Sequence, residues 1–202
     1  VRRFAQLVIE NAHFTPERVR RFVSDALPKL QIQQANDEMV RRAIISEIEH
    51  PTTSMKKSFD ALSHAHKQLL VAMLDAGRGG TLAKHLVEAH GRISGSGEDV
   101  SRLVNDLSSH FLRVKSPGHC PTCGSMTDDT FIDWMHPSWR DLLIEHLASA
   151  AKPRQEFLAK CGIEGFSLAV SSAGGATGQR QAPLIKTDGD LQAAATAAFR
   201  LI

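Results

Sequence analysis

Apolar and polar positions alternate with helical spacing over most of the 202 residues. Apolar side chains recur every three or four residues, which is the spacing of one face of an α-helix. Pro, Gly and capping residues divide the pattern into separate helices. The predicted helices span roughly residues 3–12, 15–28, 36–49, 53–62, 66–76, 81–92, 98–110 and 137–148. A weaker helical segment follows over 153–168, and an Ala-rich helix begins at Asp188 or Asp190.

Two short segments depart from helical spacing and predict strands. Residues 111–115 alternate apolar and polar side chains, and residues 130–135 are rich in strand-forming aromatic and branched residues. The segment 116–129 between them is rich in Gly, Pro, Ser and Thr. We therefore predict an antiparallel hairpin with a long tip.

The order of these elements predicts a mainly α fold in three parts. A helical bundle occupies residues 1–61. Three helices, the hairpin and a closing helix over 62–148 form the pattern of a winged-helix domain, with the two-stranded hairpin as its wing. Residues 149–202 form a helical extension, with a linker near 171–181 and the start of a further helix.

Composition narrows the possible functions. The chain is 42% hydrophobic and 23% charged, as is ordinary for a folded protein. Its net charge of +2 is too small to indicate binding to nucleic acid through overall charge. Aromatic residues make up 5% of the chain and Tyr is absent, which argues against an RNA-binding sheet whose aromatic side chains stack on the bases. Three cysteines do not form a disulfide framework and favour a reducing, cytoplasmic location. Apolar runs are shorter than the roughly 20 residues that span a membrane, so no membrane partner is expected.

The most informative stretch is the corner between the second predicted strand and the closing helix. Pro137 suits the first position of a helix, which places His136 where the strand turns into the helix. The first backbone N–H groups of a helix lack intrahelical acceptors and can bind an anion. His136 is therefore a candidate anion-binding residue, and a structural role at the end of the strand is the alternative.

This corner resembles the end of the winged helix in STAND-type NTPases, the AAA+-related signalling ATPases of bacterial defence and of NB-ARC immune receptors. Bacterial members carry a phrase like Phe-His-His-Pro-Ser-x-Arg-Asp-Phe-Leu. The segment here reads Trp134-Met135-His136-Pro137-Ser138-Trp139-Arg140-Asp141-Leu142-Leu143. NB-ARC proteins carry Met-His-Asp at the matching place, and their histidine contacts the β-phosphate of ADP. The resemblance implies the same role for His136, with Pro137 in place of the aspartate.

A second phrase resembles the start of the helical lid in the same family. Phe14 is followed by Thr15, Pro16, Glu17 and Arg18. The resemblance implies that Pro16 packs near the adenine and that Arg18 senses phosphate, although Arg20 or Arg21 could take the place of Arg18.

The sequence contains no Gly-x-x-x-x-Gly-Lys-Ser/Thr loop to hold phosphates. The chain also begins at Val1 and ends within a helical pattern. We therefore expect a piece of a longer protein whose phosphate-binding loop lies N-terminal to it, so that ATP or ADP is shared between the two parts and this piece alone does not hydrolyse ATP.

A cysteine pair lies in the predicted tip of the hairpin. Cys120 and Cys123 have the spacing of two zinc ligands, and His119 precedes them. A tetrahedral site needs two more ligands, and His110 and Cys161 are distant in sequence and would have to fold back onto the pair. The alternative is two free thiols, and we expect free thiols rather than a zinc site.

Two functions follow from these patterns. The first is a regulatory, nucleotide-sensing part of a STAND-type ATPase, which holds ADP at rest and permits homo-oligomerisation in a signalling or antiviral defence protein. The alternative is a winged-helix DNA-binding module whose recognition helix spans 98–110. That helix carries Glu98, Asp99 and Asp106 against Arg102, which is a poor surface for phosphates.

Overall fold

A computed structural model describes residues 36–49, 53–77, 79–95, 97–108, 110–115, 126–173 and 183–202. The chain divides into two compact units, residues 1–58 and residues 59–202. The described residues are mainly helical and include one small antiparallel sheet, which confirms the predicted mainly α class.

In the first unit the structure describes one complete helix, α3, over Asp37–Glu49. The Asn36 side chain accepts a hydrogen bond from the backbone N–H of Met39 at 2.9 Å, so it caps this helix, which was predicted over 36–49. The next helix, α4, spans Thr53–Asp60 and confirms the predicted short helix. The two helices predicted before α3 lie outside the described residues.

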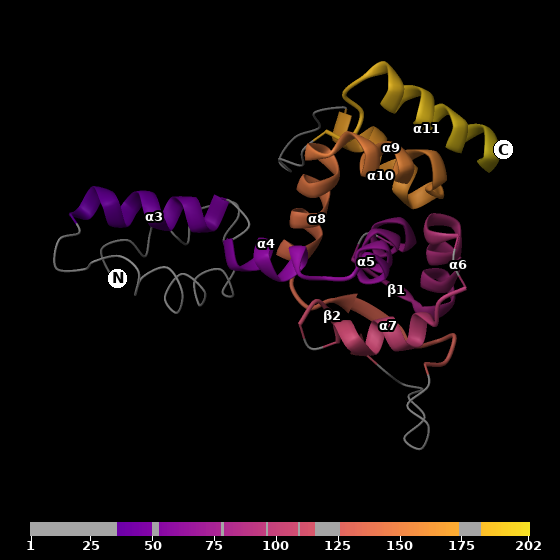
Figure 1. The fold of residues 1–202 in the computed structure, drawn as a ribbon, viewed down its shortest axis with the longest axis horizontal. Coiled ribbons are helices and arrows are strands. Elements are labelled where there is room, and N and C mark those ends of the chain that lie inside the picture. The colour runs from indigo at the N-terminus through magenta and orange to yellow at the C-terminus, as the bar shows by residue number, and fades with distance from the viewer. Residues whose placement is uncertain are drawn as a thin grey trace. The chain divides into compact units, whose positions relative to one another are not determined.

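The second unit is built around α5, His64–Ala76, which buries six consecutive or near-consecutive side chains. The Ser63 hydroxyl accepts from the backbone N–H of His66 and starts the helix. Helix α5 contacts α6 (Ala83–Ser94), α7 (Val100–Leu107) and α8 (Pro137–Ser149), and also α10 (Ile163–Ala173). Figure 1 shows α5 in the middle of this unit with these helices around it.

The predicted hairpin is present. Strand β2, Leu112–Lys115, pairs antiparallel with β3, Phe131–Trp134, and Leu112 lies opposite Trp134. The side chain of Ile132, in β3, is fully buried. The tip of the hairpin, residues 116–125, lies outside the described residues.

One strand was not predicted. Gly80–Leu82 forms β1, which pairs with β3 on the side opposite β2. Thr81, the first residue of the helix predicted over 81–92, therefore lies in a strand, and α6 starts at Ala83. The Thr81 hydroxyl donates to the carbonyl of Ala76 at 3.1 Å instead. A Cβ at Gly80 would lie 2.7 Å from the Phe131 ring, so only glycine permits this close pairing.

In the C-terminal part, the described residues form the helices α9 (Ala151–Lys160), α10 and α11 (Asp188–Leu201). The predicted helical segment over 153–168 is broken at Gly162, because a side chain from α5 caps the start of α10 there. Helix α10 also continues to Ala173, into the linker predicted near 171–181, and residues 174–181 of that linker lie outside the described residues. Thr187 caps α11, which confirms the predicted start of the last helix.

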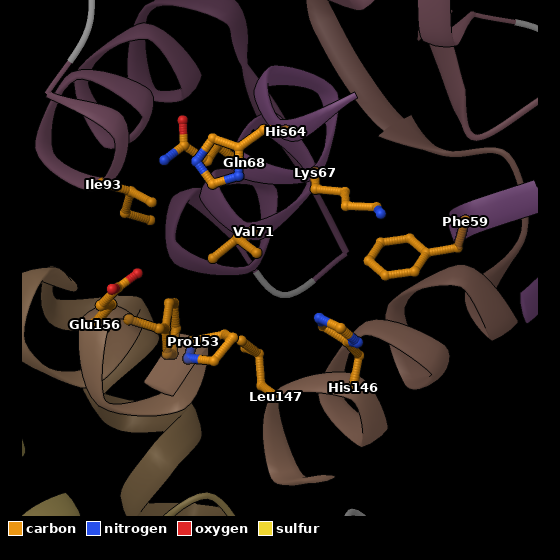
Figure 2. Close-up of a pocket in the computed structure, with 11 residues that line it drawn as sticks. Phe59, His64, Lys67, Gln68, Val71, Ile93, His146, Leu147, Pro153 and Glu156 are labelled. Carbon is orange, nitrogen blue, oxygen red and sulfur yellow. The ribbon is translucent and has the colours of Figure 1, made fainter. Parts of the chain in front are cut away.

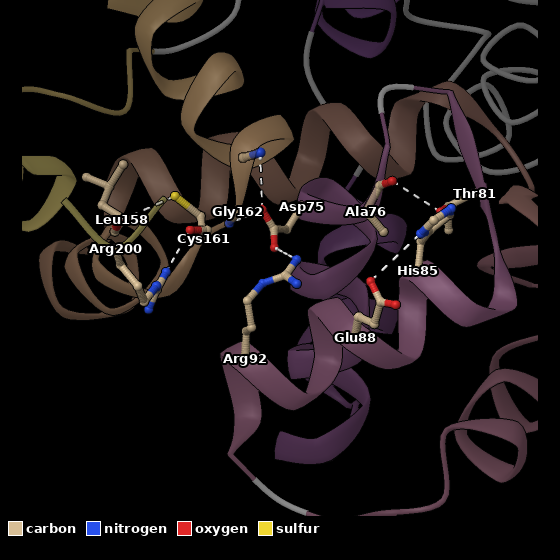
Figure 3. Close-up of polar contacts among 11 residues, drawn as sticks. Asp75, Ala76, Thr81, His85, Glu88, Arg92, Leu158, Cys161, Gly162 and Arg200 are labelled. Carbon is tan, nitrogen blue, oxygen red and sulfur yellow. Dashed lines mark hydrogen bonds and ion pairs between the residues drawn. The ribbon is translucent and has the colours of Figure 1, made fainter. Parts of the chain in front are cut away.

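A buried carboxylate joins α5 to α10. The Asp75 side chain is fully buried and accepts hydrogen bonds from the backbone N–H groups of Gly162, at 2.6 Å, and Gly165, at 3.2 Å. Arg92 of α6 donates to its other oxygen at 2.8 Å. Figure 3 shows Asp75 between the Arg92 guanidinium and the start of α10. Residues far apart in sequence are thus fixed to one another by a single side chain.

Candidate functional site

The His136 corner is formed as the sequence predicts. Strand β3 ends at Trp134, and His136 is the N-cap of α8 with Pro137 at the first helical position. The Nδ1 atom of His136 accepts a hydrogen bond from the backbone N–H of Ser138 at 3.2 Å. An imidazole that accepts at Nδ1 is neutral and carries its proton on Nε2. The structure therefore gives His136 a defined structural role, which is to cap α8.

Aromatic packing holds this corner in place. Trp139, in the first turn of α8, is almost fully buried and donates from its indole N–H to the carbonyl of His110 at 2.9 Å. Its ring lies 4.2 Å, between centroids, from the ring of Phe111, which precedes β2. The backbone N–H of Met135 donates to the carbonyl of Phe111 at 2.9 Å. The start of α8 is thus fixed against both strands of the hairpin.

A cation beside the corner was not singled out as a site residue from the sequence. Arg113, on β2, donates to the carbonyl of Met135 at 3.5 Å, one residue before His136. Arg113 lies opposite Asp133 in the strand register, and Lys115 donates to Asp133 at 2.7 Å. The pairing of the two predicted strands is the signal that could have identified Arg113, because it brings the middle of β2 next to the end of β3.

The other predicted site residues fall outside the described residues. These are Pro16 and Arg18 at the predicted start of the lid, and Cys120 and Cys123 with His119 in the tip of the hairpin. The structure therefore tests neither the nucleotide contacts expected of the lid nor the zinc pair.

Within the described segments, no group of three or more His, Cys, Asp or Glu side chains is arranged to hold a metal ion. Cys161, considered as a distant zinc ligand, is fully buried and its thiol donates to the carbonyl of Leu158. Burial, followed by the nearby charge of Asp75, raises the pKa of Cys161 to about 12. A thiol that stays protonated at neutral pH is a poor metal ligand and a poor nucleophile.

No protein-family model, curated protein or solved structure matches this chain.

Among the helices that the structure describes, none has both the length and the apolar character needed to cross a membrane.

Proposed function

We propose that this chain is the nucleotide-sensing, regulatory part of a STAND-type ATPase. The observation that supports the proposal most is the position of His136, at the N-terminus of the helix that follows the hairpin. This is the place at which the family resemblance expects a histidine that contacts the β-phosphate of ADP.

The electrostatics of the corner also favour an anion. The N-terminus of α8 carries the positive end of the helix dipole. The Arg113 guanidinium adds a full positive charge beside the Met135 carbonyl. A neutral imidazole that accepts at Nδ1 has an N–H at Nε2 with which it can donate to a phosphate oxygen. The corner thus combines three features that suit a phosphate.

In this proposal residues 62–148 act as a winged-helix domain that closes with the N-terminal lid over ADP, and exchange for ATP releases this domain and permits homo-oligomerisation. The phosphate-binding loop of the ATPase would precede Val1, and Pro16 and Arg18 would contact the nucleotide from the lid. A ligand shifts such an equilibrium only if it contacts one state more strongly than the other, and His136 supplies that difference.

DNA binding, the alternative, gains no support from α7. Asp99 caps this helix by accepting from the backbone N–H groups of Ser101 and Arg102. Asp106 is exposed, and one of its carboxylate oxygens lies 3.3 Å from Nε2 of His66. An acidic helix start and an acidic exposed face repel phosphates.

Two variants of His136 distinguish its role as the cap of α8 from its proposed role as a nucleotide sensor. His136→Ala removes the cap of α8 and is expected to lower the free energy of unfolding by about 1 kcal/mol. His136→Asn replaces the imidazole by one of the best N-capping side chains, so the free energy of unfolding should stay within about 0.5 kcal/mol of the original. Urea unfolding followed by circular dichroism measures both values.

If His136 also senses nucleotide, both variants should weaken ADP binding in the protein that includes the upstream loop, and should make its signalling constitutive. Equal ADP affinity in the original protein and in His136→Asn would restrict His136 to the cap and would refute the sensor role. Failure of that longer protein to bind ADP at all would refute the proposed function itself.

A further inference from the structure

A pocket of about 130 Å³ opens between α5, α8 and α9, away from the His136 corner. Figure 2 shows side chains from these helices around it, together with one from the end of α4 and one from the end of α6. All of them belong to the unit that starts at Phe59. The lining residues are Phe59, His64, Lys67, Gln68, Val71, Ile93, His146, Leu147, Pro153, Glu156 and Phe157.

The floor and sides of the pocket are largely apolar. Ile93, Leu147 and Phe157 are buried, and Val71 and Pro153 are half-buried beside them. An apolar protein cavity of about 150 Å³ stays dry and binds benzene. The volume and lining here are therefore suited to an apolar group the size of one benzene ring.

On one side of the pocket, the lining side chains already contact other groups of the protein. The Lys67 ammonium donates to the carbonyl of Asp60 at 2.9 Å and lies 5.4 Å from the centre of the Phe59 ring. The His146 ring meets the Phe59 ring edge to face at 4.9 Å. Burial, with a smaller effect of the Lys67 charge, lowers the pKa of His146 although Asp60 acts in the opposite direction. The His146 side chain is consequently uncharged at pH 7 and lines the pocket without offering a positive charge.

The polar groups on the rest of the rim have no such contacts. The side chains of His64, Gln68 and Glu156 form no hydrogen bond or ion pair with any residue that the structure describes. In the view of Figure 2 they lie toward the side away from Lys67 and Phe59. Glu156 is the one acidic side chain in the lining, so its carboxylate is available to a cationic ligand.

From this arrangement we propose that the pocket binds a small hydrophobic amine. The apolar part of the ligand fills the space above Val71, Leu147 and Pro153, and its ammonium group pairs with the Glu156 carboxylate at the rim. A carboxylate ligand would instead need Lys67, which is held by Asp60 and Phe59. This proposal does not depend on nucleotide sensing, because it concerns a different set of residues.

The test compares three probes that share one ring and differ in charge: benzylamine, benzyl alcohol and benzoate. Each is titrated into the 202-residue chain while the methyl NMR signals of Val71, Ile93 and Leu147 are followed. Benzylamine should bind about three-fold more tightly than benzyl alcohol, which is the effect of a partly exposed ion pair, and benzoate should bind most weakly.

Two variants and a control locate the binding. Glu156→Gln should reduce the affinity for benzylamine to that for benzyl alcohol and leave benzyl alcohol unchanged. Val71→Phe fills the pocket and should abolish the binding of both. Glu145→Gln, on α8 but outside the lining, should change neither affinity.

Several outcomes would overturn the proposal. They are an absence of shifts at the methyl groups of all three residues, tighter binding of benzoate than of benzylamine, and equal binding of benzylamine and benzyl alcohol. Glu156→Gln is a change at an exposed position and leaves the core intact, so it decides the question even if Val71→Phe fails to fold.

Discussion

Asp190→Ala is expected to lower the free energy of unfolding by about 3–5 kcal/mol, because it leaves the buried guanidinium of Arg154 without its counter-charge. The Asp190 side chain is fully buried and Arg154 is 4% exposed. The Nε atom of Arg154 donates to an Asp190 oxygen at 3.0 Å. The other oxygen accepts from the backbone N–H groups of Lys186 and Thr187, each at 3.0 Å.

The ion pair also supports the end of α8. Arg154 donates from Nη1 to the carbonyl of Ala148 at 3.0 Å, and the Lys186 ammonium donates to the same carbonyl at 2.8 Å. The last carbonyls of a helix have no intrahelical donors. Asp190 thus connects the starts of α9 and α11 to the C-terminus of α8, and its loss should loosen all three.

Urea unfolding of the 202-residue chain measures the effect. Asp188→Ala removes an exposed carboxylate from the same helix turn and is the matched control, with an expected loss of about 0.5 kcal/mol. Replacing both partners, in Arg154→Met with Asp190→Leu, should recover most of the stability, because no unpaired charge is left buried. A loss in Asp190→Ala no larger than in Asp188→Ala would contradict the role assigned to this pair.

Acid gives an independent measure of the same pair. Burial raises the pKa of Asp190, but hydrogen bonds from Arg154, Lys186 and Thr187 outweigh it and lower the pKa from 3.8 to about 2. Because the folded pKa lies below the ordinary value, the stabilisation is present above about pH 4 and is lost as the pH falls toward 2. This contribution amounts to about 2 kcal/mol and should be absent from the acid titration of the double replacement.

Asp75→Ala is expected to cost about 3 kcal/mol, because it removes the acceptor for two buried N–H groups at the start of α10 and the partner of Arg92. Arg92 is 37% exposed, so water can partly replace its lost contact. The larger part of the cost therefore comes from the N–H groups of Gly162 and Gly165, which water does not reach without an opening of the structure.

The same unfolding measurement separates these contributions. Asp75→Asn keeps a carbonyl oxygen for the two N–H groups and should cost about half as much as alanine. Arg92→Gln removes the charge and leaves the capping contacts, and should cost about 1 kcal/mol. If Arg92→Gln were as damaging as Asp75→Ala, the ion pair and not the cap would be the main interaction.

Local patterns were sufficient to predict the hairpin, the strand-to-helix corner, the helices α3, α4, α5, α7 and α8, and the start of α11. Their signals, such as alternation in β2 and Pro137 at the start of α8, lie within a few residues of each element. Strand β1 was not predicted because three residues are too few to show an alternation of apolar and polar positions. In addition, Gly80 is typical of a break between two elements. Its pairing depends on the approach to Phe131, which is distant in sequence.

The break between α9 and α10 was missed for a similar reason. The residue that caps α10 is Asp75, in a helix far upstream, and no local motif connects it to Gly162. At the corner, the sequence predicted the place of His136 but did not show that its ring would cap α8 or that Arg113 would lie nearby. Both depend on strand pairing and on ring orientation, which only the folded chain provides.

The most direct test of the proposed nucleotide sensor is the rate at which fluorescently labelled ADP dissociates from the protein that includes the upstream phosphate-binding loop. His136→Asn keeps the cap of α8 but loses the imidazole N–H. If that N–H contacts the β-phosphate, its loss should raise the dissociation rate by at least about 10-fold, since a hydrogen bond to a charged group contributes about 1.5–3 kcal/mol. An unchanged dissociation rate in His136→Asn would show that His136 serves the fold alone.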